Sequence, residues 1–205
     1  MSRIKYDLPV TKESGKSTQY PNKLMRGKYS GLNSTAKQIA EYIPKCKIYV
    51  EPFAGLGRLT KYIQADQIIL NDMSDFAYEF LSKNKNCVVT QIQFEDIIKK
   101  HDSENTFFLF DPPWRTGHYQ DNDLPFCDRK AFEYYEKLFE LVPNLKGDWI
   151  LCCDKKEMEI KKICSKSKYD NLIIDSNQKL FGRTIGVMLT SNKPFKRYHQ
   201  TEITQ

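Results

Sequence analysis

Short apolar runs that end on a glycine turn or an acidic residue recur along the first half of this chain, and they constrain its fold most. Ile48–Val50 runs into a glycine-rich turn, Gln67–Leu70 ends at Asn71-Asp72, and Thr106–Phe110 ends directly at Asp111. The third run is almost continuously apolar, as expected of a strand buried on both faces. Segments with helical spacing separate these runs. The alternation predicts an α/β sandwich around a mainly parallel sheet.

The same alternation continues to the end of the chain. We expect helices at about Thr35–Tyr42, Arg58–Ile63, Asp75–Lys83, Phe94–Lys100, Arg129–Leu141 and Lys156–Lys166. Further strands are expected at Val88–Ile92, Trp149–Cys153, Leu172–Ile174 and Ile185–Thr190, the last two as a closing antiparallel pair. Reactive residues should then lie at the carboxyl ends of the strands, as in other open α/β sheets.

Composition bounds the class of protein. The chain has 205 residues, 40% of them hydrophobic, which suits one domain with a continuous core. No run approaches the roughly 18 apolar residues of a membrane span, and the N-terminus lacks a signal-peptide core, so we expect an intracellular protein, cytoplasmic or associated with the nucleoid. The six cysteines form no CxxC pair and no metal-ligand spacing with the three histidines, so we expect reduced thiols and no metal site.

Basic residues gather at the two ends of the chain. The 32 Lys and Arg outnumber the 26 Asp and Glu, for a formal charge of +6, and this modest excess favours a polyanionic partner without requiring one. Residues 1–27 lack an apolar period and are expected to form a flexible basic arm. Residues 193–205 form a basic tail, and 28–192 form the folded domain. The two ends either grip phosphates or are simply solvated.

The turn Glu51–Gly57 indicates a nucleoside ligand. Gly55 and Gly57 would let the backbone approach a ligand closely. Asp72 ends the next strand, about 15 residues on, where it can accept hydrogen bonds from both ribose hydroxyls of an adenosine. The turn lacks the lysine and hydroxyl of a P-loop, and Glu51 would repel phosphates but suit the ammonium of a methionyl group. S-adenosyl-L-methionine is therefore favoured over NAD or a triphosphate, with a turn that binds no ligand as the alternative.

Asp111-Pro112-Pro113-Trp114 is the more specific pattern. An exocyclic amino group of a base is a weak nucleophile, because its lone pair is delocalised into the ring. The Asp111 carboxylate and the Pro112 carbonyl can accept its two N–H bonds and favour a tetrahedral nitrogen for in-line attack on a methyl sulfonium. The two prolines restrict the backbone, and Trp114 would stack on a flipped-out base. A rigid turn beside a buried tryptophan is the alternative interpretation.

With these residues placed, the chain resembles the Dam-like class of DNA adenine-N6 methyltransferases from about Lys28 to Asn192. Lys28-Tyr29-Ser30-Gly31 is similar to the Lys-Trp-x-Gly cofactor element of that class, and Tyr49–Gly57 to its Tyr-Val-Glu-Pro-Phe-x-Gly-x-Gly turn. Phe94-Glu95-Asp96 resembles a strand end near the cofactor's adenine, and Asp111–Trp114 the catalytic Asp-Pro-Pro-Tyr.

The resemblance implies a Rossmann-like class I methyltransferase fold, S-adenosyl-L-methionine as the cofactor and the N6 amino group of adenine in DNA as the methyl acceptor. It assigns catalysis to Asp111, Pro112, Pro113 and Trp114. It assigns cofactor binding to Lys28, Tyr29, Glu51, Pro52, Phe53, Gly55, Gly57, Asp72, Gln93, Phe94 and Asp111. The DNA enzymes of this class use an initial aspartate for adenine N6, whereas cytosine N4 enzymes often use serine.

Three departures from the family pattern affect this expectation. Leu32-Asn33 replace the usual Gly-Gly-Lys, which removes a lysine contact, and Gln93 replaces an acidic residue, although an amide can still bond an adenine edge. Only Ile97–Asn105 separates the cofactor half from the catalytic motif, where the DNA enzymes carry a large target-recognition segment. The chain therefore lacks room for sequence readout at that point.

The sequence leaves three functional hypotheses open. The first is an adenine-N6 methyltransferase of DNA, with specificity from the basic arm, the loop Arg115–Cys127, a separate specificity subunit or a homo-oligomer. The second keeps the chemistry and changes the substrate to RNA. The third is a non-catalytic nucleic-acid-binding subunit with the same fold. The cofactor turn precedes the catalytic motif here, opposite to the order in the messenger-RNA adenine methyltransferases.

Overall fold

The computed structural model describes residues 35–113, 136–154, 170–180 and 183–198. The predicted N-terminal arm, Lys28, Tyr29, Trp114, the loop Arg115–Cys127 and the predicted helix Lys156–Lys166 lie outside these residues, as does most of the predicted helix Arg129–Leu141.

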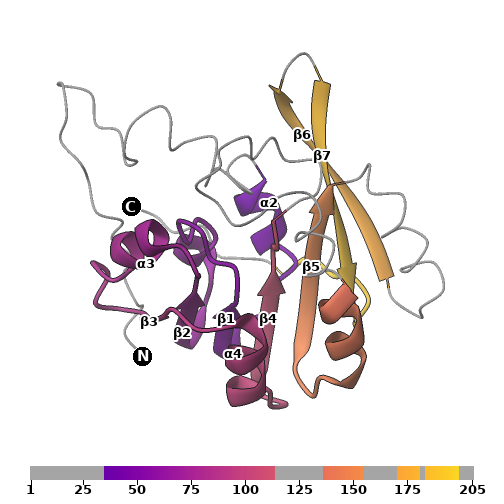
Figure 1. The fold of residues 1–205 in the computed structure, drawn as a ribbon. Coiled ribbons are helices and arrows are strands. Elements are labelled where there is room, and N and C mark those ends of the chain that lie inside the picture. Colours follow the sequence, from indigo (N-terminus) through magenta and orange to yellow (C-terminus); the bar gives the residue numbers. More distant parts are fainter. Residues whose placement is uncertain (1–34, 114–135, 155–169, 181–182, 199–205) are drawn as a thin grey trace, which may run out of the picture.

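A seven-stranded sheet organises the described chain, with the strand order β3-β2-β1-β4-β5-β7-β6 (Figure 1). The strands are β1 (Cys46–Glu51), β2 (Ala65–Asn71), β3 (Val88–Thr90), β4 (Thr106–Phe110), β5 (Asp148–Asp154), β6 (Asp170–Leu180) and β7 (Arg183–Ser191). The first five pair in parallel, and β7 pairs antiparallel with both β5 and β6. This confirms the predicted mainly parallel sheet with an antiparallel strand at its end.

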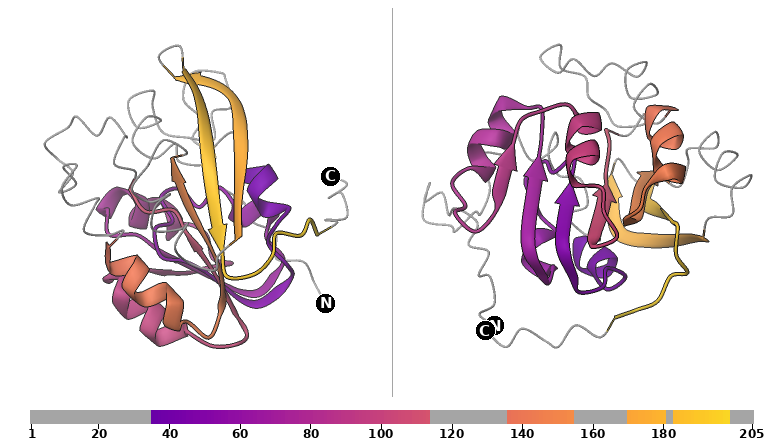
Figure 2. Two further views of the ribbon diagram at one scale, coloured as in Figure 1. Left: turned by 90° about the vertical axis from the view of Figure 1, so that its right-hand side faces the viewer. Right: turned by 90° about the horizontal axis from the view of Figure 1, so that it is seen from below.

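Helices cover both faces of the sheet. They are α2 (Ala36–Ala40), α3 (Asp75–Leu81), α4 (Phe94–His101) and a helical segment at 136–141. One core cluster contains α2 and α3 residues such as Ile39 and Phe80, and the other contains α4 residues such as Ile97. In Figure 2, α4 and the 136–141 segment lie side by side on the face away from α2.

Successive side chains of the central strands pack alternately into the two core clusters. On β4, Phe107 and Leu109 belong to one cluster, whereas Phe108 and Phe110 belong to the other. Successive side chains of a strand point to opposite faces, so a strand between two helical layers must be apolar throughout. All five residues of β4 are buried. This confirms the two-sided burial predicted from the sequence.

One predicted helix and both closing strands differ from those observed, and the strand predicted at Val88–Ile92 ends at Thr90. The helix expected at Arg58–Ile63 is only the 3-10 turn η1 (Thr60–Tyr62), because β2 begins at Ala65 and leaves no room for further turns. The closing strands are longer than predicted, at 11 residues for β6 and nine for β7. Their outer parts are mixed in polarity and have no apolar alternation from which to predict a strand.

Residues after β7 return to the end of α2. Phe195 meets the Tyr42 ring edge-on with centroids 5.7 Å apart, the Arg197 Nε donates to the Tyr42 hydroxyl at 3.1 Å, and the Tyr198 amide donates to the Glu41 carbonyl at 2.7 Å. The described part of the predicted basic tail is therefore packed against the domain. Within the described ranges, we find no helix whose length and apolar character would suit a membrane span.

Candidate active site

The candidate residues lie at the carboxyl ends of adjacent parallel strands. Glu51 ends β1, Asn71 ends β2 with Asp72 directly after it, and Asp111 follows β4. Because β1 lies between β2 and β4, Glu51 is flanked by the strand ends that carry Asp72 and Asp111. The fold thus brings the glycine turn, the predicted ribose ligand and the first residue of the catalytic motif to one edge of the sheet.

The turn after β1 needs glycine because of its backbone conformation. Gly55 has φ +52° and Gly57 has φ +59°, in the left-handed region that other residues rarely adopt. The Gly57 amide donates to the Ala54 carbonyl at 2.7 Å, which closes the turn. A Cβ built at Gly55 meets no atom within 4 Å, so the space beside Gly55 is open. A ligand can therefore approach the backbone there.

Asp72 holds this turn as well as facing the site. Its Oδ2 accepts the Gly55 amide at 2.7 Å, and its Oδ1 accepts the Ser74 amide at 2.9 Å. Burial raises the pKa of the Asp72 carboxyl, and the two N–H bonds work against that rise by favouring the ionised form. Each carboxylate oxygen has a further lone pair, so ribose hydroxyls can still be accepted. Sequence reasoning found Asp72 but not its bond to the turn.

Asn71 joins three segments around the site and was not among the residues predicted from the sequence. Its Nδ2 donates to the carbonyls of Pro52 at 3.1 Å and Ile92 at 2.9 Å. Its Oδ1 accepts the Thr90 hydroxyl at 2.8 Å and the Ile92 amide at 3.0 Å. Only 1% of Asn71 is exposed. The sequence could have indicated this role, because Asn71 is a polar residue at the end of a buried apolar strand.

Glu51 is a buried acid among other acids. It is 3% exposed, and its Oε2 accepts a 3.4 Å hydrogen bond from the buried Tyr49 hydroxyl. Burial raises the pKa of Glu51 well above its ordinary value, and the carboxylates of Asp111 and Asp72 raise it further, whereas the bond from Tyr49 lowers it. A bound cation would relieve this repulsion. The cluster therefore suits a positively charged ligand.

The described part of the catalytic motif begins immediately after β4. Pro112 is buried, and Asp111 and Pro113 are half-buried. The charge of Asp111 also acts on the neighbouring strand β5. Burial raises the pKa of the Cys152 thiol most, and repulsion from the Asp111 carboxylate raises it next. Asp111 thus lies close to both Glu51 and β5, at the centre of the carboxyl edge.

Phe94-Glu95-Asp96 opens α4, which confirms the helix predicted at Phe94–Lys100, so it is not the strand end that the resemblance implied. β3 stops at Thr90, because the next hydrogen bonds of this segment go to Asn71, and Phe94 is the first residue of α4 with Gln93 as its N-cap. Phe94 is 2% exposed and its ring lies 5.1 Å from that of Phe53. Gln93 is exposed. Phe53 and Phe94 therefore form an apolar contact beside the glycine turn.

Residues 32–93 match the family model of D12 class N6 adenine-specific DNA methyltransferases. This match confirms the resemblance to the Dam-like enzymes over these 62 of the 205 residues, which include the glycine turn and Asp72 and end before Asp111. No curated protein matches the sequence.

Solved structures match over most of the chain. A Streptococcus mutans protein assigned as a methyltransferase, in complex with SAH, has 13% identity and a TM-score of 0.50, covering 78% of this chain and 97% of that one. An rRNA methylase of Streptococcus thermophilus has 13% identity and a TM-score of 0.47, covering 78% and 95%. The tRNA m1G37 methyltransferase of M. jannaschii has 19% identity and a TM-score of 0.47, covering 78% and 48%.

The family match and the fold together support a methyltransferase of the S-adenosyl-L-methionine-dependent class. The strand order and the antiparallel β7 are those of the predicted Rossmann-like class I fold.

Proposed function

We propose that this chain transfers a methyl group from S-adenosyl-L-methionine to the N6 amino group of adenine in DNA. The observation that carries the proposal is the convergence of Glu51, Asp72 and Asp111 around the glycine turn at one edge of the sheet. The predicted domain 28–192 is the catalytic unit in this proposal.

The residues present fit this cofactor. S-adenosyl-L-methionine carries two positive groups, an ammonium and a sulfonium. The carboxylates of Asp111 and Asp72 repel the buried carboxylate of Glu51, so a nearby positive charge would stabilise its ionised form. Asp72 takes the ribose hydroxyls while it keeps the Gly55 amide. The open space beside Gly55 admits the cofactor to the backbone, and the Phe53–Phe94 contact supplies an apolar wall for the adenine. Lys28, Tyr29, Pro52, Gly57 and Gln93 complete the proposed set.

Asp111 and Pro112 prepare the acceptor amine. When bound, the cofactor supplies a methyl group on an electron-poor sulfur. The Asp111 carboxylate and the Pro112 carbonyl accept the two N–H bonds of the amino group, which localises the lone pair on nitrogen. Transfer would form the N–C bond as the S–C bond breaks, the electron pair would stay on sulfur, and the nitrogen would release one proton to solvent water. Pro113 restricts the backbone, and Trp114 stacks on the flipped base.

The choice of adenine in DNA rests on the description of the matching family and on the initial aspartate of the motif. Tritium transfer from labelled cofactor to matched DNA and RNA pools tests it. Incorporation into DNA supports the proposal. Incorporation into RNA alone would show that the substrate is RNA and not DNA. Incorporation into neither pool, with cofactor binding intact, would favour a non-catalytic subunit. A specificity subunit or a homo-oligomer remains a prediction that size measurements on the active sample can check.

A further inference from the structure

The β6–β7 hairpin rises far beyond the rest of the sheet. Phe110 pairs with Leu151, and Leu151 pairs with Thr190, so Thr190 is level with the end of β4. The strand β7 begins at Arg183, seven residues farther toward the carboxyl edge. At about 3.4 Å per residue, the hairpin extends about 24 Å past Phe110. Figures 1 and 2 show it standing above every other strand.

This hairpin stands beside the proposed catalytic residue. Only β5 separates β7 from β4, and strands lie about 4.8 Å apart, so β7 runs about 10 Å from the strand that ends at Asp111. The hairpin therefore projects past the carboxyl edge of the sheet on one side of the proposed active site.

The outer part of the hairpin differs in composition from its base. At the base, Ile174, Val187, Met188 and Leu189 are buried in the two cores. Beyond the pair Asp175–Gly186, the strands carry Ser176, Asn177, Gln178, Lys179, Leu180, Arg183, Thr184 and Ile185. Lys179 and Arg183 are the charged residues among these, and both are basic. Most of this stretch consists of residue types that hydrogen-bond to phosphates and base edges.

The pairing of the hairpin is also irregular in this outer part. Asp175 pairs with Gly186 and Lys179 with Thr184, so three residues of β6 lie opposite one of β7. Such bulges bend a strand, increase its twist and are common beside functional sites. Lys179 and Arg183 are brought to the same end, because Leu180 pairs with Arg183.

We propose that the β6–β7 hairpin is a DNA-contacting element beside the proposed active site, to which Lys179 and Arg183 contribute two positive charges. This inference rests on the proposed function. A two-stranded ribbon fits the major groove, which is about 12 Å wide, and the hairpin projects farther than that width. It offers a source of DNA contact that the short segment Ile97–Asn105 cannot provide.

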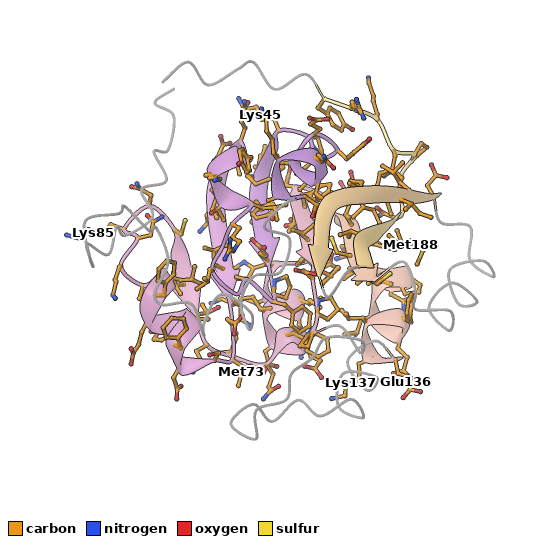
Figure 3. All side chains as sticks on the ribbon, turned by 90° about the horizontal axis from the view of Figure 1, so that it is seen from above. Lys45, Met73, Lys85, Glu136, Lys137 and Met188 are labelled. Carbon is orange, nitrogen blue, oxygen red and sulfur yellow. The ribbon has the colours of Figure 1, made fainter. Side chains whose placement is uncertain are left out.

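The test compares two double variants that each lose two positive charges. The variant K179A/R183A changes the hairpin, and the control K83A/K85A changes exposed lysines before β3, at the opposite edge of the sheet. Figure 3 shows Lys85 on the far side from Met188 of β7. Binding of a fluorescent duplex is followed by anisotropy across salt concentrations, and cofactor affinity is followed by calorimetry as a check on folding.

Loss of two positive charges from the hairpin should weaken duplex binding about tenfold at low salt and lower the slope of log affinity against log salt by about two. The control K83A/K85A should keep a higher duplex affinity and a steeper salt slope than K179A/R183A. The wild type and both variants should bind S-adenosyl-L-methionine equally. Equal duplex affinities and salt slopes for the two variants would overturn the hairpin's role while leaving methyl transfer to DNA intact. A wild-type protein that neither binds nor methylates DNA would instead overturn the proposed function, and the inference with it.

Discussion

Glu51→Gln should make the cofactor-free protein more stable and, at the same time, weaken its cofactor binding. The change keeps the shape of the side chain and an oxygen that can accept the Tyr49 hydroxyl, and it removes only the charge. The raised pKa of Glu51 means that ionising this buried carboxyl opposes folding. The wild-type protein should therefore lose stability as pH rises from the unfolded value near 4.5 through the folded value, and the variant should lose less.

The size of the effect follows from linkage. At a pH above both pKa values, each unit by which the folded pKa exceeds the unfolded one lowers the free energy of unfolding by about 1.4 kcal/mol. This corresponds to about 3–5 °C in Tm for a chain of this length. Binding should change in the opposite direction. Loss of a charged hydrogen bond to the cofactor's ammonium costs about 1.5–3 kcal/mol, or about 10–150-fold in Kd.

Thermal unfolding at pH 8, without and with S-adenosyl-L-methionine, measures both effects in one experiment. We expect the variant to have the higher Tm without cofactor and the smaller rise on adding it. Glu51→Ala would add a cavity and is a poorer probe. A variant that is less stable without cofactor and binds it as tightly as the wild type would refute both the buried-charge argument and the placing of the ammonium.

Three further changes probe the same edge of the sheet. Asp72→Ala removes the proposed ribose ligand, so the Kd of S-adenosyl-L-methionine and of SAH should both rise about 100-fold or more in calorimetry; unaltered values would place the ribose elsewhere. Asn71→Ala leaves up to four buried or half-buried polar groups without partners and should cost about 3 kcal/mol in urea unfolding, whereas a loss below about 1 kcal/mol would show that Asn71 does not hold the three segments. Gly55→Ala should cost only about 1–2 kcal/mol of stability, for its left-handed φ, yet weaken cofactor binding more strongly; equal losses would mean that no ligand approaches this backbone.

Much of the fold was predictable because burial on two faces leaves a plain pattern. The run Thr106–Phe110 could only be an internal strand, and Asp111 after it had to lie at the carboxyl edge. Glu51, Gly55 and Asp72 were likewise predictable, since parallel strands bring their ends together. These inferences needed only local sequence and the rules of sheet topology.

The remaining features depend on long-range contacts that a sequence pattern does not contain. The bond from the Gly55 amide to Asp72 joins residues 17 apart, and those made by Asn71 span up to 21. The short turn in place of the helix Arg58–Ile63 follows from where β2 begins. The outer hairpin has mixed polarity, so its strands could be recognised only from their pairing with each other.

Mass identification of the methylated nucleoside tests the central claim most directly. Duplex DNA incubated with the protein and S-adenosyl-L-methionine is digested to nucleosides, and Asp111→Ala, with its cofactor affinity measured by calorimetry, serves as the matched control. The account predicts N6-methyl-2′-deoxyadenosine with the wild-type protein and none with the variant. N4-methyl-2′-deoxycytidine, no methylated deoxynucleoside at all, or an unchanged yield with Asp111→Ala would contradict it.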